Sequence, residues 1–387
     1  MDGYFIKNVK IITKSSIISG YGVIIENGKI SSVCSGDCET GRYSVIDGKG
    51  MYLSPGFIDL HNHGNNGADA MDATYEALDT MSKFHIKNGV TGFLATTLTA
   101  SRENTFKAIK NAVDFMGQKY NGGSQVLGLY LEGPYFSQIK KGAQPAEYIV
   151  DIDLDEIAGY IEAGKGKIKI LALAPELEKS RDAIHFLKEK GITISAGHTN
   201  ATYAEAMDGI NNGITEATHL YNGMRTLSHK EPGVLAACLL DSRVCCEMIC
   251  DGIHVNPATM KIAVKMKGRD KIALVTDSLR GNGLPDGKYM DDGRMVIVKD
   301  NQVRLEDGTL AGSTLTLNRA VKNMVEKVGV SLCDAVLMAS YNPAKQIGEA
   351  GRKGSIDIGK DADLVIFDNE VNVKTVLVGG KIVYQAE

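Results

Sequence analysis

PGFIDLHNHG, residues 55–64, joins a short apolar run to two histidines that stand two positions apart. A run of this length, bounded by proline and glycine, predicts a buried β-strand over 56–60. His61 and His63 then lie just beyond the carboxyl end of that strand. In a parallel β/α barrel the carboxyl ends of all strands meet at one mouth, where active sites are built.

Seven further apolar runs follow, with helical patterns between most of them. One helical pattern, residues 73–89, ends at Gly89, a typical helix stop. Strand and helix alternating eight times predict an α/β fold, a (β/α)8 barrel of the TIM type over residues 56–347. The eight predicted strands are 56–60, 92–97, 126–131, 168–173, 192–196, 214–218, 245–249 and 271–276.

Both ends of the chain have strand patterns instead. Residues 1–55 contain Asn27-Gly28 between two apolar runs, and residues 348–387 contain Gly379-Gly380, which are both hairpin signals. Neither end alone has enough strands for a stable sheet, so we expect the two ends to build one small β-sandwich domain together. Residues 283–310 interrupt the barrel rhythm and predict a hairpin insertion after the eighth strand, at the rim of the mouth.

Polar residues follow five of the predicted barrel strands. They are His61, His63, Glu132, His198, His219 and Asp277. Imidazole nitrogens and carboxylate oxygens converging on one mouth are typical of a divalent metal site. With two ions, His61 and His63 would hold one, His198 and His219 the other, and Glu132 could bridge them.

Each of these residues also has an ordinary structural interpretation. A single histidine at a strand end is usually a hydrogen-bonded side chain, Glu132 could cap a turn, and Asp277 could cap a helix. Independent structural causes would rarely place all six at successive strand ends. The joint pattern therefore favours the metal site.

The ordered motifs carry a family resemblance that covers essentially the whole chain. They are PGFIDLHNHG, LEGP, SAGHT, THLYNGM, EPG, DGIHV, VTDS, LAGS, NPA and GKDADLVIFD. In this order they resemble the N-acetylglucosamine-6-phosphate deacetylases of the amidohydrolase superfamily. The resemblance implies hydrolysis of the acetamide of N-acetylglucosamine 6-phosphate to glucosamine 6-phosphate and acetate.

The resemblance also implies roles for individual residues. Glu132, His198 and His219 match the main metal site, and His61 and His63 match a pair that only some members use for a second ion, with zinc or iron as the expected metal. Asp277 matches the catalytic acid/base. The matching substrate-contact residues are Ala143, Gln144, Asn222, Gly223, Lys230, His254, Leu310, Ala311 and Gly312.

Two of these positions depart from the family pattern. Gln144 stands where members often have histidine, and Lys230 stands where they often have an arginine that reaches the phosphate of the neighbouring subunit. Lysine can pair with phosphate but lacks the bidentate fork of arginine. The resemblance thus implies a homodimer in which Lys230 reaches the partner's phosphate site.

The residue types suggest a mechanism. A bound divalent ion would lower the pKa of a water molecule, and Asp277 would orient that water, take its proton and return a proton to the departing amine. The metal, with Gln144 or His254 as helpers, would polarise the carbonyl.

Three alternatives stay open. One is the same reaction on the galactosamine epimer, N-acetylgalactosamine 6-phosphate. Another is a cyclic-amide hydrolase, although members of that class typically bridge their metals with a modified lysine after the fourth strand, and ILALAPE (170–176) contains none. The third is a non-catalytic scaffold, which would usually have lost metal ligands.

Composition is that of an ordinary globular protein of 387 residues, with 43% hydrophobic residues and a net charge of −4. That charge does not favour a nucleic-acid or membrane-surface partner. The apolar runs are too short to cross a bilayer, and the first residues lack the apolar core of a secretory signal. Seven cysteines, an odd number, in a long chain without a visible signal favour the reducing cytosol, so we expect a cytoplasmic enzyme.

Overall fold

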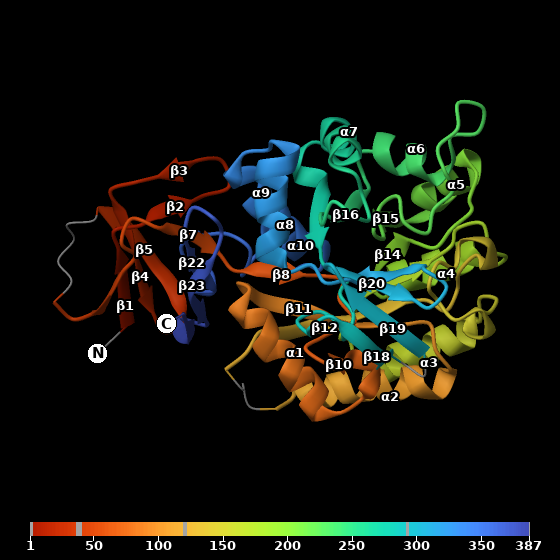
Figure 1. The fold of residues 1–387 in the computed structure, drawn as a ribbon, viewed down its shortest axis with the longest axis horizontal. Helices are drawn as coiled ribbons and strands as arrows, with labels where there is room; N and C mark the ends of the chain where they lie inside the picture. Colours follow the sequence, from red (N-terminus) through yellow and green to blue (C-terminus); the bar gives the residue numbers. More distant parts are fainter. Residues whose placement is uncertain (1–2, 36–40, 119–121, 292–293, 387) are drawn as a thin grey trace.

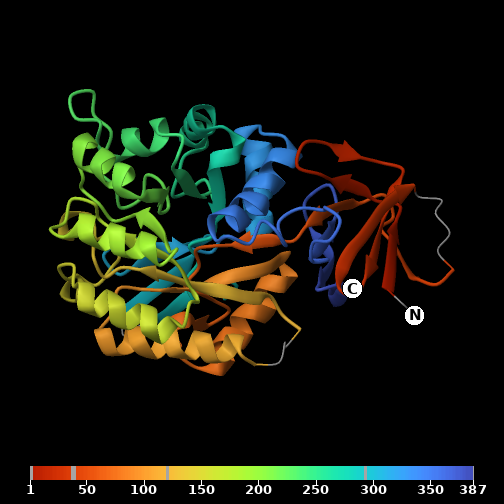
Figure 2. The same ribbon diagram turned by 180° about the vertical axis from the view of Figure 1, so that it is seen from behind.

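The computed structural model describes residues 3–35, 41–118, 122–291 and 294–386, arranged as a large barrel and a smaller β domain. In Figures 1 and 2 the first and last segments of the chain lie side by side in the smaller domain, while the middle of the chain forms the barrel. The predicted α/β fold class, a barrel with a β-sandwich made from both ends, is confirmed.

The barrel sheet has eight parallel strands in the order of the sequence. All eight predicted runs form strands of this sheet. They are β8 (Phe57–Asp59), β11 (Val90–Thr97), β12 (Gln125–Glu132), β13 (Ile168–Leu173), β14 (Thr193–Ala196), β15 (Ile214–Ala217), β16 (Cys245–Ile249) and β17 (Ile272–Val275).

Hydrogen bonds between the first and last strand ends close the barrel. The Asp277 amide donates to the His61 carbonyl (2.8 Å), and the His63 amide donates to the Ser278 carbonyl (2.9 Å). Thr276 Oγ1 also donates to the buried carboxylate of Asp59 (2.7 Å). These bonds bring two segments more than 200 residues apart in the sequence into contact at the mouth.

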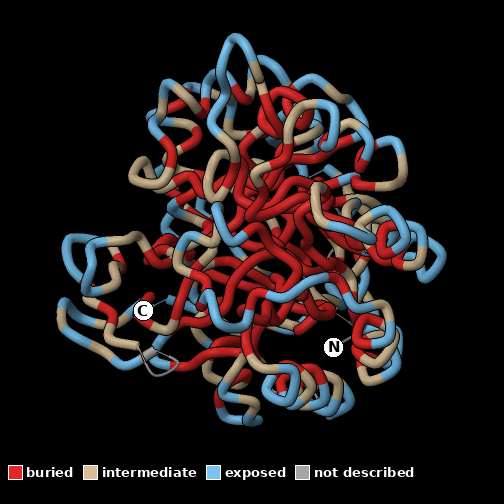
Figure 3. The backbone as a smooth tube through the Cα atoms, turned by 90° about the vertical axis from the view of Figure 1, so that its right-hand side faces the viewer, coloured by how far each residue is buried: buried red, intermediate tan, exposed pale blue. Residues whose placement is uncertain are grey.

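Helices surround the sheet and shield its strands from water. All eight residues of β11 are buried, for example, and Figure 3 shows the buried backbone concentrated at the centre of the barrel. The helices are α1 (Tyr75–Lys87), α2 (Arg102–Met116), α3 (Leu154–Gly164), α4 (Ser180–Glu189), α5 (Tyr203–Asn212), α6 (Gly233–Leu240), α7 (Pro257–Lys267), α8 (Leu317–Asn323), a π-helical turn at Met324–Val328, α9 (Leu332–Ala339) and α10 (Tyr341–Gln346).

Helix α1 shows how local sequence sets the boundaries. The Thr74 hydroxyl accepts a hydrogen bond from the Ala77 amide and caps the amino end. At the other end, Asn88 is the C-cap and Gly89 adopts a positive φ of 79°, a conformation that glycine adopts without a steric cost. The predicted stop at Gly89 is therefore confirmed.

The β-sandwich consists of two sheets. Strands β5-β4-β1-β6 form one sheet, and β24-β23-β22-β7-β2-β3 form the other. In the second sheet β22 pairs antiparallel with β7, which joins the two ends of the chain. The strands are β1 (Gly3–Lys7), β2 (Lys10–Ile12), β3 (Ile17–Ile18), β4 (Tyr21–Glu26), β5 (Lys29–Ser35), β6 (Ser44–Asp47), β7 (Tyr52–Pro55), β22 (Leu364–Phe367), β23 (Val373–Val378) and β24 (Lys381–Gln385).

Both predicted hairpin turns occur in this domain. Asn27 and Gly28 join β4 to β5, and Gly379 and Gly380 join β23 to β24, all four with positive φ. Such two-residue turns match the right-handed twist of the flanking strands.

The insertion after the eighth strand is larger than the predicted hairpin. It forms a four-stranded antiparallel sheet of β18 (Gly287–Asp291), β19 (Arg294–Lys299), β20 (Gln302–Leu305) and β21 (Leu310–Ser313). Strand β21 leads back to the barrel mouth, where Ser313 bonds to the Asp277 carbonyl through its amide (2.8 Å). A short hairpin, β9 (Gly64–Asn65) with β10 (Ala68–Asp69), also lies beside the mouth.

The cysteines among the described residues fall into two groups. Cys34 is disulfide-bonded, whereas five others in the barrel half of the chain are free and buried: Cys238, Cys245, Cys246, Cys250 and Cys333. No helix among the described residues is both long enough and apolar enough to traverse a bilayer.

Candidate metal centre and active site

The predicted metal ligands occupy equivalent positions in the barrel. Glu132 is the last residue of β12, and His61, His198 and His219 each stand two residues beyond the end of a strand. Asp277 also stands two residues after its strand, β17. Because the strands are parallel, these side chains meet at one mouth.

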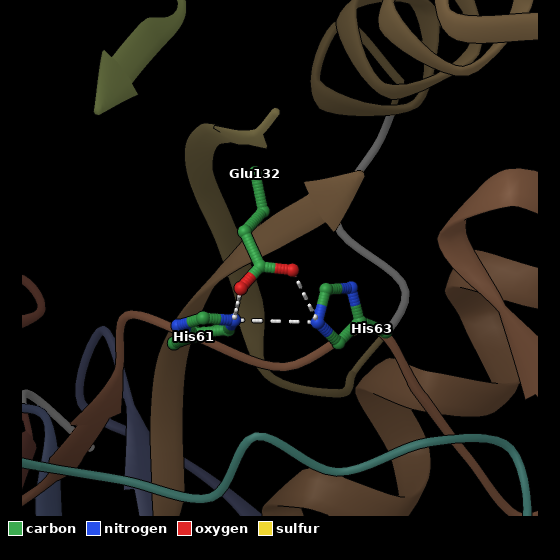
Figure 4. A group of neighbouring side chains, drawn as sticks. All are labelled: His61, His63 and Glu132. Carbon is green, nitrogen blue, oxygen red and sulfur yellow. Dashed lines mark hydrogen bonds and ion pairs between the residues drawn. The ribbon is translucent and has the colours of Figure 1, made fainter. Parts of the chain in front are cut away.

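Two groups of possible ligands share the Glu132 carboxylate. In one, Glu132 Oε1 lies 3.0 Å from His219 Nε2 and 3.3 Å from His198 Nε2. In the other, Oε1 lies 3.5 Å from His61 Nε2 and Oε2 lies 3.4 Å from His63 Nε2. Figure 4 shows both imidazoles of the second group turned toward the carboxylate. Each group could hold one cation, and a shared carboxylate fits a bridging ligand.

Hydrogen bonds at the far side of two rings support metal binding. His198 Nδ1 donates to the Lys140 carbonyl (2.9 Å), because a carbonyl oxygen can only accept. Its Nε2 is then the atom with the free lone pair, directed at Glu132. His61 Nδ1 likewise contacts a Glu247 carboxylate oxygen (2.8 Å). This arrangement is typical of metal-binding histidines.

The electrostatics of the cluster favour positive charge. Burial lowers the pKa of His61 to about 4. Burial also acts against charge on His63 and His219, but the carboxylates of Glu132 and Asp277 outweigh it and raise the pKa of both histidines to about 9. A divalent cation would supply the same compensation more effectively than protons.

Asp277 lies beside the second ligand group. Its Oδ1 is 3.3 Å from His63 Nε2 and 3.6 Å from His61 Nε2. Burial alone would raise the pKa of Asp277, but His61 and His63 hold it below the usual value. An ionised carboxylate at the edge of the ligand cluster can accept a proton from a water molecule bound there.

Three of the site residues have unusual backbone conformations. His198, His219 and Asp277 have positive φ values of 45°, 28° and 48°. This region is costly for residues with a Cβ and often marks functional sites. The neighbouring Gly223 has no space for a side chain, since an added Cβ would lie 2.8 Å from His198 Nδ1.

A cavity of about 210 Å³ opens over the ligand cluster. Most of the residues predicted from the sequence line it. They are His63, Glu132, Ala143, Gln144, His198, His219, Asn222, Gly223, His254, Asp277, Leu310, Ala311 and Gly312. His61 lies deeper, in contact with the cluster. Lys230 is exposed on the loop before α6 and does not line the cavity of its own chain.

Two predicted substrate contacts have additional partners in the structure. Gln144 Nε2 donates to Glu132 Oε2, while its Oε1 accepts from the Thr99 amide (3.1 Å), so Gln144 orients the shared carboxylate. His254 Nδ1 contacts Asp251 Oδ2 (2.6 Å). The other ring nitrogen, Nε2, therefore faces away from Asp251.

Sequence reasoning missed two residues at the site. Arg294, at the start of β19, lines the cavity and donates to the Ala143 carbonyl. Glu247 in β16 contacts His61, and burial raises its pKa to about 7, next to the buried carboxyl of Glu216. A charged residue within the apolar run CCEMI (245–249) was the available signal for Glu247.

Known proteins resemble this chain over nearly its whole length. The family model described as "Amidohydrolase family" matches residues 52–383. The N-acetylglucosamine-6-phosphate deacetylase of Bacillus subtilis (strain 168) is 39% identical over 386 residues, which cover 99% of this chain and 98% of the relative. The N-acetylgalactosamine-6-phosphate deacetylase of Escherichia coli O157:H7 is 35% identical, over 96% of this chain and 97% of that protein.

Solved structures show the same fold over the whole chain. The N-acetylglucosamine-6-phosphate deacetylase of Pasteurella multocida superposes with a TM-score of 0.94 at 34% identity, covering 99% of this chain and 100% of the other. A mutant of the Mycobacterium smegmatis deacetylase in complex with N-acetyl-D-glucosamine-6-phosphate gives 0.93 at 28% identity, with full coverage of both chains. With the family match extending over most of its length, the chain belongs to the amidohydrolase family.

Proposed function

We propose that this protein is a metal-dependent deacetylase that hydrolyses N-acetyl-D-glucosamine 6-phosphate to D-glucosamine 6-phosphate and acetate. The observation that carries the proposal is the convergence of Glu132, His198 and His219 beside Asp277 in one cavity. The full-length similarity to deacetylases of this name supports the substrate class.

The proposed chemistry is hydrolysis of a linear amide. A divalent ion held by Glu132, His198 and His219, with room for a second beside His61 and His63, would lower the pKa of a water and polarise the acetamide carbonyl. We propose zinc or iron. Asp277 orients the water and takes one of its protons. The water oxygen first adds to the carbonyl carbon, and the carbon–nitrogen bond then breaks as Asp277 delivers the proton to the departing amine.

The cavity also contains a feature that suits an anionic substrate. Arg294 is the one arginine or lysine side chain among the described residues that line it. A guanidinium binds phosphate with two parallel hydrogen bonds and keeps its charge at any physiological pH. Asn222, Gly223, His254 and the segment 310–312 would surround the sugar. We further propose that Lys230 supplies a second cation to the partner subunit of a cytoplasmic homodimer.

A second candidate substrate is N-acetylgalactosamine 6-phosphate, which the name of the Escherichia coli relative favours. The decisive experiment compares acetate release from both 6-phosphates and from both unphosphorylated sugars. The proposal expects the highest kcat/KM for the glucosamine compound. A preference for the galactosamine compound would support the second candidate, and activity only on cyclic amides would refute both.

A further inference from the structure

Glu247 is a buried carboxylate in the middle of an apolar strand. It belongs to β16, has an exposed fraction of 0%, and lies against the predicted metal ligands His61 and His219. A buried carboxylate needs specific partners to compensate for lost hydration. The partners of Glu247 are therefore informative about its role.

A single oxygen of Glu247 contacts both ligand groups. Its Oε2 lies 2.8 Å from His61 Nδ1 and accepts a hydrogen bond from the backbone amide of His219 at 3.0 Å. His61 belongs to the group with His63, whereas His219 belongs to the group with His198. Glu247 thus joins the two groups while belonging to neither of them.

We propose that Glu247 is a positioning residue that holds the proton of His61 on Nδ1 and fixes this ring relative to the turn at His219. The inference rests on the proposed metal site and concerns how that site is built. With Nδ1 protonated, the free lone pair of His61 lies on Nε2, which faces His63 Nε2 at 3.2 Å and Glu132. Without Glu247, the proton could move to Nε2 and block the ligand atom.

The expected consequence is a selective loss of metal affinity. Removing an outer partner of a metal-binding histidine typically weakens metal binding about 10- to 100-fold. In Glu247→Ala the ion beside His61 and His63 should therefore bind that much more weakly. The ion held by His198 and His219 should be less affected, because there Glu247 contacts only a backbone amide. Glu247→Gln retains an accepting oxygen and should lie closer to wild type.

Glu216 is a matched control. It is also fully buried, on the neighbouring strand β15, and its Oε2 accepts a hydrogen bond from Gln346 Nε2 (2.8 Å). No hydrogen bond of the described residues joins it to a predicted metal ligand, but its carboxyl contacts that of Glu247. Glu216→Gln therefore tests whether a change in the carboxyl beside Glu247, with the contact to His61 left in place, is enough to alter metal binding.

The experiment titrates chelator-stripped protein with zinc by calorimetry and measures bound zinc by mass spectrometry. Melting curves of the metal-free variants check that each one folds. The inference expects two ions on wild type and on Glu216→Gln, and a weakened second ion on Glu247→Ala. Two ions of wild-type affinity on Glu247→Ala, an equal loss on Glu216→Gln, or a single ion on wild type would each overturn it.

If Glu247→Ala does not fold, a spectroscopic measurement on the wild type still tests the inference. In zinc-loaded wild type labelled with 15N-histidine, the His61 proton should be on Nδ1, with His61→Asn used to assign the signal. A proton on Nε2 would overturn the inference. Acetate release by wild type is measured separately, so an inactive protein that binds two ions would refute the proposed function and not the role of Glu247.

Discussion

Both the backbone and the side chain of Asp277 contact predicted metal ligands. The residue stands two positions after the end of β17, its amide bonds to the His61 carbonyl, it has a positive φ, and its carboxylate lies beside His63. The same turn also bonds to Ser313 of the insertion, so three segments hold the carboxylate in place. Such support is what a proton-transfer residue requires, because the reaction depends on short distances.

Asp277→Asn should lower kcat by about 10²- to 10⁴-fold, the typical contribution of general acid–base catalysis. Asparagine retains the shape but cannot accept the proton from water. Substrate binding, measured by calorimetry, should change little, and metal content should stay near wild type. Near-normal turnover by this variant would remove Asp277 from the mechanism.

His198→Ala should lose both its activity and the ion expected between Glu132, His198 and His219. The ring contributes the Nε2 atom 3.1 Å from His219 Nε2, and without it this ligand group retains only Glu132 and His219. Bound metal and acetate release measure the two effects. His185→Ala is the control, since that histidine lies on α4 and bonds to Asn212 away from the site. Full metal content and full activity in His198→Ala would contradict the assignment.

The strand elements could be predicted well because each consists of a short apolar run followed by a polar residue. The period of the pattern identifies such strands, and the parallel order then places the six polar residues together. The same reasoning could not find Arg294, because its contact is with Ala143, 151 positions away, and depends on how the insertion folds over the mouth. It also could not find the role of Gln144, whose side chain bonds to a ligand carboxylate.

Arg294 of the insertion sheet should contribute to specificity for the phosphorylated sugar. Arg294→Met should weaken apparent binding of the phosphorylated substrate by about tenfold to a hundredfold, because a charge-assisted hydrogen bond contributes about 1.5–3 kcal/mol. Arg294→Lys should recover part of this loss, since it keeps the charge but not the fork. KM for the phosphorylated and unphosphorylated sugars measures the effect.

Lys299→Met is the control for that prediction. Lys299 is an exposed residue at the other end of β19 and does not line the cavity. Its loss should leave both KM values unchanged. If Arg294→Met weakened binding of the unphosphorylated sugar to the same extent, Arg294 would act by holding the Ala143 segment rather than by binding phosphate.

At the scale of the whole molecule, one predicted residue stands apart from the site. Lys230 is exposed on the loop between β15 and α6, whereas its predicted companions Asn222 and Gly223 line the cavity. A cation at that position could serve a phosphate only if the loop entered another chain's cavity or moved toward its own. The family resemblance identifies Lys230 as a contact, but the cavity that it reaches depends on how two chains pack, which the order of motifs along one chain does not encode.

Lys230→Ala should therefore weaken binding of the phosphorylated substrate by about tenfold to a hundredfold and leave the unphosphorylated sugar almost unaffected. Mixing Lys230→Ala subunits with Asp277→Asn subunits tests the dimer. In a mixed dimer one active site has its own Asp277 and receives Lys230 from the partner, so part of the phosphate-selective activity should return. Each variant alone provides the baseline. Subunit exchange confirmed by mass spectrometry without any recovery would mean that Lys230 acts within its own chain or has no role in phosphate binding.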